Sequence, residues 1–232
     1  MTANTKHTET LTRYLSDTEK HVFTVLAEGP VTHLRYARPG SSFDFVEVVA
    51  WPGNLVVSGD MGTYAFQRES DMLAFFRKPL GKINPSYWAE KLEAADRRCG
   101  YESFSRAKMI EHFTDAAREH AEDEGWPDEA RDALLADLRD FWPDDYGNHQ
   151  ESLDYLQRTF TVIHGATRYE HRPDTDEASE SAFSVYVTQY LWSLHAIVHL
   201  IGLYDAFRAE RASQDAADRA AAARIHYAIR GS

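Results

Sequence analysis

The fold of this chain is decided by the stretch FDFVEVVAWPGNLVVSGDMGTYAFQRESDMLAFFRKPLGKINPSYWAEKL, residues 43–92. Its first half is rich in β-branched and aromatic residues, which favour strands. Pro52-Gly53 and the glycines around Asp60 are typical of turns between them. We therefore expect three successive strands, at 43–51, 54–57 and 63–67.

The second half of this stretch predicts a short helix and then a longer one. Asn84 followed by Pro85 is a typical helix start, with an N-cap and a proline in the first turn, so the longer helix should begin near Ser86. Upstream, 21–27 and 31–38 alternate apolar and polar residues as half-exposed strands do.

The whole chain, 1–232, is expected to form a single α+β domain. Strands come first and helices follow, which favours an N-terminal antiparallel sheet of four or five strands, at about 21–67. The helical part, about 69–229, should cover the sheet. The core is expected to contain Val46, Val48, Val49, Trp51, Trp88, Leu92, Leu191, Trp192 and Ile197.

Apolar stripes at helical spacing predict the individual helices of the later chain. Two of them should stop at Trp126-Pro127 and Trp142-Pro143, and a third should carry Leu153, Leu156, Phe160 and Ile163. A long loop is expected at 165–180, followed by helices at 181–207 and 213–229. The apolar run 190–204, at ~1.5 Å per residue, is too short for a ~30 Å bilayer core and predicts a buried helix.

The net charge of −12 is concentrated in one segment. Of 37 acidic and 25 basic residues, fifteen and three fall between Glu111 and Asp154, so the remainder carries 22 of each. A charge balance of this sign disfavours direct binding to nucleic acid, which requires clustered Lys and Arg.

Cysteine content and the N-terminus indicate a cytoplasmic protein. Cys99 is the single cysteine and cannot form an internal disulfide, and the first residues lack the basic and apolar segments of a secretory signal. Although Arg97 and Arg98 flank Cys99, no partner motif accompanies it, so an incidental thiol is expected.

Three phrases resemble a family of uncharacterised bacteriophage and prophage proteins: WPGNLVVSGDMGTYAF at 51–66, INPSYWAEKLEA at 83–94 and YLWSLHAIVHLIGLYD at 190–205. The resemblance covers about half of the chain and carries no activity or catalytic residue with it. It implies a protein made in the cytoplasm of a bacterial host cell.

His195 and His199 are candidate metal ligands, because residues four apart share one helix face. Ala196 stands where the zinc metalloprotease motif has its glutamate, and a third ligand would have to be His164, His171 or Asp205. The alternative is a hydrogen-bonded pair within a packed helix. A metal-dependent hydrolase is the corresponding functional hypothesis.

A second candidate site is a turn containing Ser58, Gly59, Asp60, Gly62 and Thr63. Such a loop can present backbone N–H groups to an anion, so a nucleotide or small-anion binding protein is a further hypothesis. The glycine spacing matches neither the dinucleotide fingerprint nor the P-loop, and a hairpin turn explains both glycines more simply.

The acidic segment supports the preferred hypothesis, an interaction protein that binds a basic partner through its helical surface. The resemblance implies that this partner is a host defence or nucleic-acid-binding protein. A solvated helix face is the alternative. The expected contact residues are Glu119, Glu122, Asp123, Glu124, Asp128, Glu129, Asp132, Asp137, Asp140, Asp144 and Asp145.

No enzyme or cofactor is predicted, because the sequence does not show a nucleophile, base and orienting group that belong together. No membrane partner is expected, and a homo-oligomer is left open.

Overall fold

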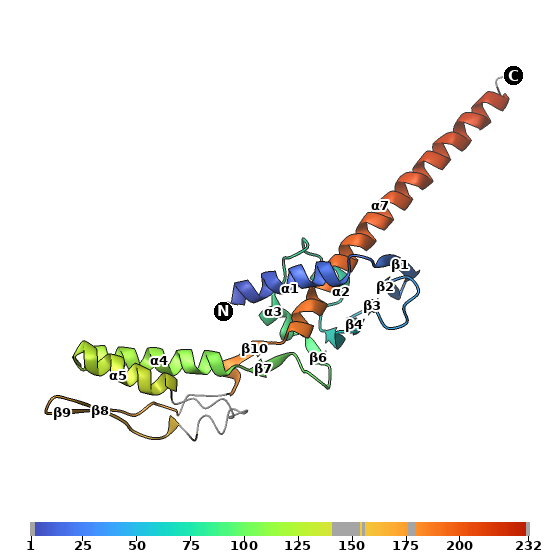
Figure 1. Cartoon of the computed structure of the whole chain (residues 1–232). Helices are drawn as coiled ribbons and strands as arrows, with labels where there is room; N and C mark the ends of the chain where they lie inside the picture. The colour runs from blue at the N-terminus through green and yellow to red at the C-terminus, as the bar shows by residue number, and fades with distance from the viewer. Residues whose placement is uncertain (1–2, 141–153, 155, 176–179, 231–232) are drawn as a thin grey trace. The chain divides into compact units, whose positions relative to one another are not determined.

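The computed structural model describes residues 3–140, 154, 156–175 and 180–230 (Figure 1). Its contacts group into two compact units, residues 1–101 with 186–232 and residues 102–185. The sequence had predicted one domain. Because the second unit is inserted between Tyr101 and Tyr186, the chain crosses between the units twice, and neither crossing carries the Pro- or Gly-rich composition of a linker.

The first unit is built on a six-stranded antiparallel sheet, which confirms the expected α+β class. Each strand pairs with the next along the chain, so the sheet is a meander. The strands are β1 (Val22–Ala27), β2 (Thr32–Ala37), β3 (Phe45–Trp51), β4 (Asn54–Gly59), β5 (Gly62–Gln67) and β6 (Leu92–Ala94). The predicted strands all form, and β6 is an addition.

Alternation along β3 decides which of the expected core residues are buried. Val46, Val48 and Ala50 point to the covered face and are buried. Val49 lies on the opposite face and is only half-buried, and Trp51 is 40% exposed. Including both in the core was wrong, because successive side chains of a strand point to opposite faces of its sheet.

Four helices belong to the first unit: α1 (Ala3–Asp17), α2 (Met72–Phe76), α3 (Pro85–Ala89) and α7 (Thr188–Arg230). Asn84 caps α3 as predicted, because its side chain accepts a hydrogen bond from the backbone N–H of Tyr87 at 3.4 Å. The expected longer helix is nevertheless only five residues long. The chain re-enters the sheet as β6, where Leu92 is half-buried and not in the core.

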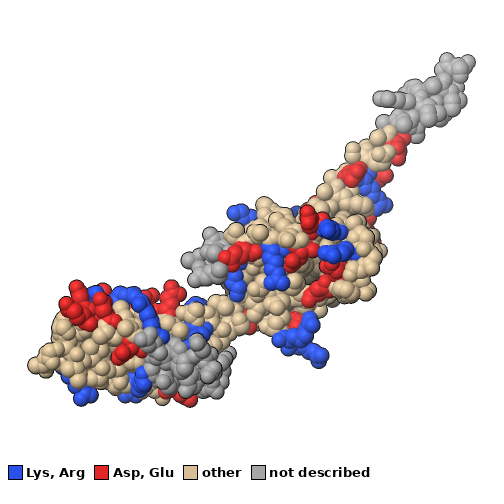
Figure 2. Space-filling model, in the orientation of Figure 1, with Lys and Arg blue, Asp and Glu red and all other residues tan. Residues whose placement is uncertain are grey.

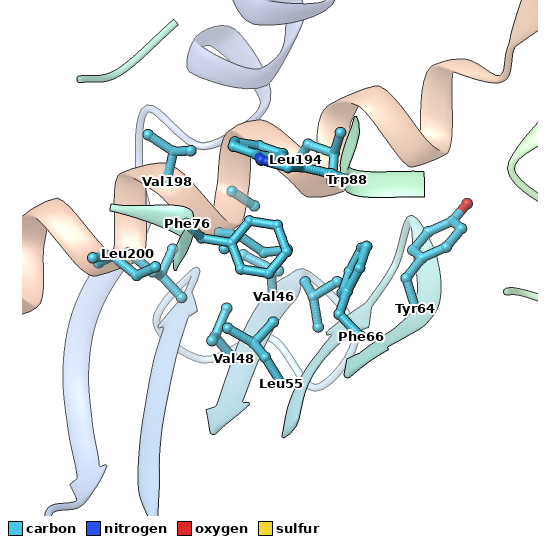
Figure 3. Packing of buried hydrophobic residues seen from close by; sticks show 14 of the residues in the cluster. Val46, Val48, Leu55, Tyr64, Phe66, Phe76, Trp88, Leu194, Val198 and Leu200 are labelled. Carbon is cyan, nitrogen blue, oxygen red and sulfur yellow. The ribbon is translucent and has the colours of Figure 1, made fainter. Parts of the chain in front are cut away.

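The core of the first unit lies between the covered sheet face and these helices (Figure 3). The ring of Phe76 packs edge-on against Phe66, with centroids 5.0 Å apart, and against Trp88, at 4.8 Å. Leu194 and Val198 approach the same cluster from α7. Val46, Val48, Trp88, Leu191, Trp192 and Ile197 are buried as predicted.

Helix α7 is one continuous element of 43 residues where two helices were predicted. Residues 190–198 are buried on every side, as in a helix surrounded by core. Residues 211–219 are exposed on every side, and this part of α7 projects beyond the sheet (Figure 1). Among the described helices, none is long and apolar enough to cross a membrane.

The second unit contains a helical hairpin of α4 (Arg106–Asp123) and α5 (Asp128–Asp140). Two small strand pairs accompany it. β8 (Phe160–His164) and β9 (Thr167–His171) pair antiparallel. β7 (Glu102–Phe104) pairs with β10 (Ser184–Tyr186), which follows the 3-10 turn η1 (Glu180–Phe183) and ends at the first residue of the returning first unit. A separate core gathers between these elements, from Met109, Phe113, Leu134, Leu138, Leu156 and Phe160.

The third predicted helix of this region was wrong at its C-terminal end. Phe160 and Ile163 lie in β8, and β9 falls inside the segment expected to be a loop. In β8 Phe160 and Val162 are buried while Ile163 is exposed, which is a period of two. Leu153 and the Trp142-Pro143 stop lie outside the described residues.

Candidate functional site

The first unit contains a cavity of about 360 Å³ at one end of its sheet. Ten residues form its wall. Arg13, Ser16 and Asp17 come from α1 and Trp192 comes from α7. The others are His21, Arg38, Asp44, Phe45, Asp60 and Met61. Six of these ten residues carry ionisable side chains. The cavity therefore brings together three carboxylates, two guanidinium groups and an imidazole.

Two of the carboxylates in this cavity are held by cations and ring N–H groups. Asp17 accepts a hydrogen bond from the indole N–H of Trp192 at 3.1 Å and lies 3.5 Å from Nε of Arg13. Asp44 lies 2.7 Å from Nε of Arg38 and 3.3 Å from Nε2 of His21. Each arginine that lines the cavity is therefore already paired with an aspartate.

Asp60, the third carboxylate, has a different environment. Its Oδ2 accepts a hydrogen bond from the backbone N–H of Phe45 at 3.2 Å, and within the described residues no cation pairs with it. Burial raises the pKa of the Asp60 carboxyl, and the nearby Asp44 adds to that shift, while the Phe45 N–H opposes it.

The His21 side chain is only 3% exposed. Burial lowers the pKa of His21, although the neighbouring Asp44 acts in the opposite direction. Within the described chain its Nδ1 is buried without a hydrogen-bond partner. If the neutral ring carries its proton on Nε2, the nitrogen 3.3 Å from Asp44, then Nδ1 is an unused acceptor.

The predicted anion loop is the hairpin between β4 and β5, in which Ser58 pairs with Thr63 and Gly59 with Gly62. A Cβ on Gly59 would fall 2.2 Å from the carbonyl oxygen of Phe45, so close packing of the hairpin on β3 requires this glycine. Of the five residues predicted to bind a ligand, only Asp60 lines the cavity. Ser58, Gly59, Gly62 and Thr63 build the hairpin that places it.

His195 and His199 both lie on α7 but in different surroundings. His195 is fully buried, and within the described chain neither ring nitrogen meets hydrogen-bond geometry with a partner. Burial lowers the pKa of His195 to about 4, with a smaller opposing influence from the backbone of His7. His199 is half-buried, and its Nδ1 lies 2.7 Å from the hydroxyl of Tyr14.

The proposed third metal ligands have other positions. Asp205 pairs with Arg77 through contacts of 2.7 and 3.2 Å, and His164 and His171 belong to the second unit. His171 packs against His120, with ring centroids 5.0 Å apart. Across the described ranges, no three His, Cys, Asp or Glu side chains are close enough to hold a metal ion. The metal site remains a prediction from sequence.

Nine of the eleven predicted partner-binding carboxylates lie on the α4–α5 hairpin. We use the name α4–α5 carboxylates for the eight whose side chains the structure describes, and all eight are exposed: Glu119, Glu122, Asp123, Glu124, Asp128, Glu129, Asp132 and Asp137. Figure 2 shows Asp and Glu side chains gathered where α4 ends and α5 begins. The side chain of Asp140, and Asp144 and Asp145, lie outside the described part.

The two helices of this hairpin differ in how their charges are ordered. α5 begins with Asp128 and Glu129 and has Arg139 in its last turn, the arrangement that the helix dipole favours. α4 has the opposite order, because it begins with Arg106 and Lys108 and ends with acidic residues. Among the described residues, Glu119, Glu122, Asp123 and Glu124 have no ion-pair partner, whereas Asp128 and Asp132 both pair with Arg131.

The sequence did not reveal the cavity, whose residues come from positions 13 to 192. The one available signal was Asp60 in its glycine-flanked turn. Cys99 is half-buried, with its sulfur 3.5 Å from the hydroxyl of Tyr64, and it is not among the residues that line the cavity. No family model, curated protein or solved structure matches the chain.

Proposed function

We propose that this chain is a non-enzymatic interaction protein that binds a basic partner protein through the α4–α5 carboxylates. The observation that carries the proposal is the distribution of charge along α4, which has basic residues at its N-terminal end and acidic residues at its C-terminal end. Each carboxylate near the C-terminal end of a helix costs about 0.3–1 kcal/mol of stability. A helix that ends in Glu119, Glu122, Asp123 and Glu124 therefore keeps charges that its own fold disfavours.

Exposure and pairing of these side chains support the same function. The α4–α5 carboxylates are exposed, and four consecutive members of the set lack ion pairs in the described chain. A partner that supplies Lys or Arg would remove this repulsion without breaking existing ion pairs. Opposite charges also steer a partner into position and accelerate association, an effect that weakens with salt.

The nature of the partner follows from the resemblance to phage and prophage proteins. A protein made in the cytoplasm of an infected bacterium meets host proteins that bind nucleic acid through basic surfaces. The α4–α5 carboxylates would occupy such a surface in place of phosphates. We therefore propose a host defence or nucleic-acid-handling protein as the partner, and inhibition as the outcome of binding.

A charge-reversed variant tests this proposal. Glu119, Glu122, Asp123 and Asp137 would be changed together to Lys, which agrees with the dipole of both helices, so the fold should be retained. The matched control reverses four exposed carboxylates of the first unit, Glu9, Glu19, Glu90 and Asp215, for which the structure shows no ion pair. The two variants have the same net charge.

The tagged wild-type protein and both variants would be used for capture from bacterial lysate at about 0.05 M and about 0.5 M salt, where the screening length falls from roughly 14 to 4 Å. Captured proteins would be identified by mass spectrometry. We expect one basic protein to bind the wild type and the control at low salt and to be lost with the α4–α5 variant. Equal capture by both variants would contradict the proposal.

A further inference from the structure

The cavity in the first unit carries an excess of negative charge. Its lining contains three carboxylates, Asp17, Asp44 and Asp60, and two guanidinium groups, Arg13 and Arg38. Each arginine is already paired with an aspartate. What the cavity still offers is therefore the Asp60 carboxylate, which the described residues leave without a cation.

A second acceptor lies in the same wall. His21 lines the cavity with its side chain almost fully buried, and its Nδ1 is without a partner in the described chain. A buried acceptor without a donor costs about 1–3 kcal/mol. Asp60, in contrast, is exposed and calls for a ligand that donates hydrogen bonds.

The remaining lining adds apolar and aromatic surface from Trp192, Phe45 and Met61. Aromatic faces attract cations, so these walls suit a positively charged group with a hydrocarbon stem. A volume of about 360 Å³ accommodates one small molecule or one long side chain.

We infer that this cavity binds a small cation that donates hydrogen bonds, a primary ammonium or a guanidinium group, with Asp60 as its charge partner. This is a different ligand class from the anion that the glycine-flanked turn predicts. The difference arises because Asp60 is the residue of this turn that lines the cavity. Gly59 is instead required where the hairpin packs closely on β3. The inference is independent of the α4–α5 carboxylates.

Asp60 is also expected to reduce the stability of the free protein. Its raised pKa means that the folded state disfavours the ionised carboxylate relative to the unfolded chain. The resulting loss of stability is absent at low pH and grows as pH rises through the raised pKa.

The ligand could reach the cavity as a free molecule or as a side chain of another protein. Two probes separate these sources: agmatine, which carries both an ammonium and a guanidinium group, and a capped Gly-Arg-Gly peptide. Both would be titrated calorimetrically into the full-length protein. Inorganic phosphate and AMP would test the alternative hypothesis, that this site binds an anion.

The decisive variant is Asp60→Asn, whose side-chain oxygen can still accept the Phe45 N–H while the charge is lost. The control variant is Asp215→Asn, which removes an exposed carboxylate of α7 outside the cavity. A hydrogen bond to a charged group contributes about 1.5–3 kcal/mol, so we expect Asp60→Asn to weaken binding by about tenfold or more. Asp215→Asn should bind like the wild type.

Binding of agmatine alone identifies a free amine as the ligand, and binding of the peptide identifies a partner side chain. The inference is overturned if neither probe binds, if Asp60→Asn binds as tightly as the wild type, or if phosphate or AMP binds instead. Thermal melting of unliganded Asp60→Asn, which should be at or above the wild-type midpoint, verifies that the variant folds.

Discussion

The backbone N–H of Trp126 donates to the carbonyl oxygen of Ala121, at 2.9 Å, where α4 ends. The N–H of Gly125 bonds in the same way to the carbonyl of Glu122, at 3.1 Å, and Gly125 has a φ of +66°. These two bonds form a Schellman motif. The turn fixes the end of the helix on which the unpaired carboxylates lie, so the proposed binding surface depends on it.

Gly125→Ala should lower the free energy of unfolding by about 1 kcal/mol, because an L side chain disfavours the left-handed backbone region. An added Cβ would meet no atom within 4 Å, so the cost comes from the backbone alone. Urea denaturation measures it. Gly202→Ala, a helical glycine of α7 with equally open surroundings, is the control and should raise stability by about 0.5–1 kcal/mol. Effects of the same sign would contradict this account.

Reversing the charges at the end of α4 should stabilise the protein. Glu122→Lys and Asp123→Lys should each add about 0.3–1 kcal/mol, since cations favour the C-terminal end of a helix. The gain should shrink in about 1 M salt, where screening is strong. Glu129→Lys, in the first turn of α5, should lower stability instead. If all three substitutions act alike, the dipole argument for α4 is wrong.

Tyr14→Phe should cost about 1–3 kcal/mol, because it removes the hydroxyl that contacts Nδ1 of His199 at 2.7 Å and leaves a half-buried ring nitrogen without a partner. Tyr36→Phe is the comparison, since the Tyr36 hydroxyl makes a longer bond of 3.3 Å to the carbonyl of Thr18. It should cost less than Tyr14→Phe in the same denaturation experiment. Equal losses would argue against the Tyr14–His199 bond.

The buried histidines should make stability fall in mild acid. The pKa of His195 is about 4 in the folded chain against an ordinary value of 6.5, because burial disfavours the charged ring. Above about pH 6.5 the group is neutral in both states. As pH falls towards about 4, the unfolded chain binds a proton that the folded chain does not, so stability is lost.

His195→Leu should therefore flatten the fall in unfolding free energy between about pH 6.5 and 4.5. Some dependence should remain, because burial also lowers the pKa of His171, to about 4, and that of His199. Denaturant titrations at several pH values provide the comparison. An unchanged slope in the variant would show that His195 does not titrate as inferred.

The sequence predicted the sheet well because its strands are local. Tight turns connect consecutive strands, and Pro52-Gly53 and the Gly59–Gly62 hairpin mark two of them. The errors arose where local pattern is ambiguous. Phe160 and Ile163 are three apart, which suits a helix, yet they lie on opposite faces of β8. The short strand β6 depends on pairing with β5 and has no signal of its own.

Of the two candidate sites, the sequence predicted the α4–α5 carboxylates but not the cavity. Exposure of the α4–α5 carboxylates follows from helical periodicity, because the apolar stripe of each helix fixes which side faces solvent. The cavity forms only where α1, the α1–β1 connection, two turns of the sheet and α7 meet. Contacts between residues so far apart in the chain cannot be predicted from local spacing. Asp60 was identified from its glycine neighbours, but the ligand class inferred for it depends on Asp44, His21 and Arg38.

The most direct test of the proposed function is the dissociation constant of the purified partner as a function of salt. Calorimetry on the wild type, on the variant with Lys at 119, 122, 123 and 137, and on the first-unit control would provide it. We predict that wild-type and control binding weakens steeply with salt, and that the α4–α5 variant binds about tenfold or more weakly at low salt. A dissociation constant that is the same for all three proteins and insensitive to salt would contradict the account.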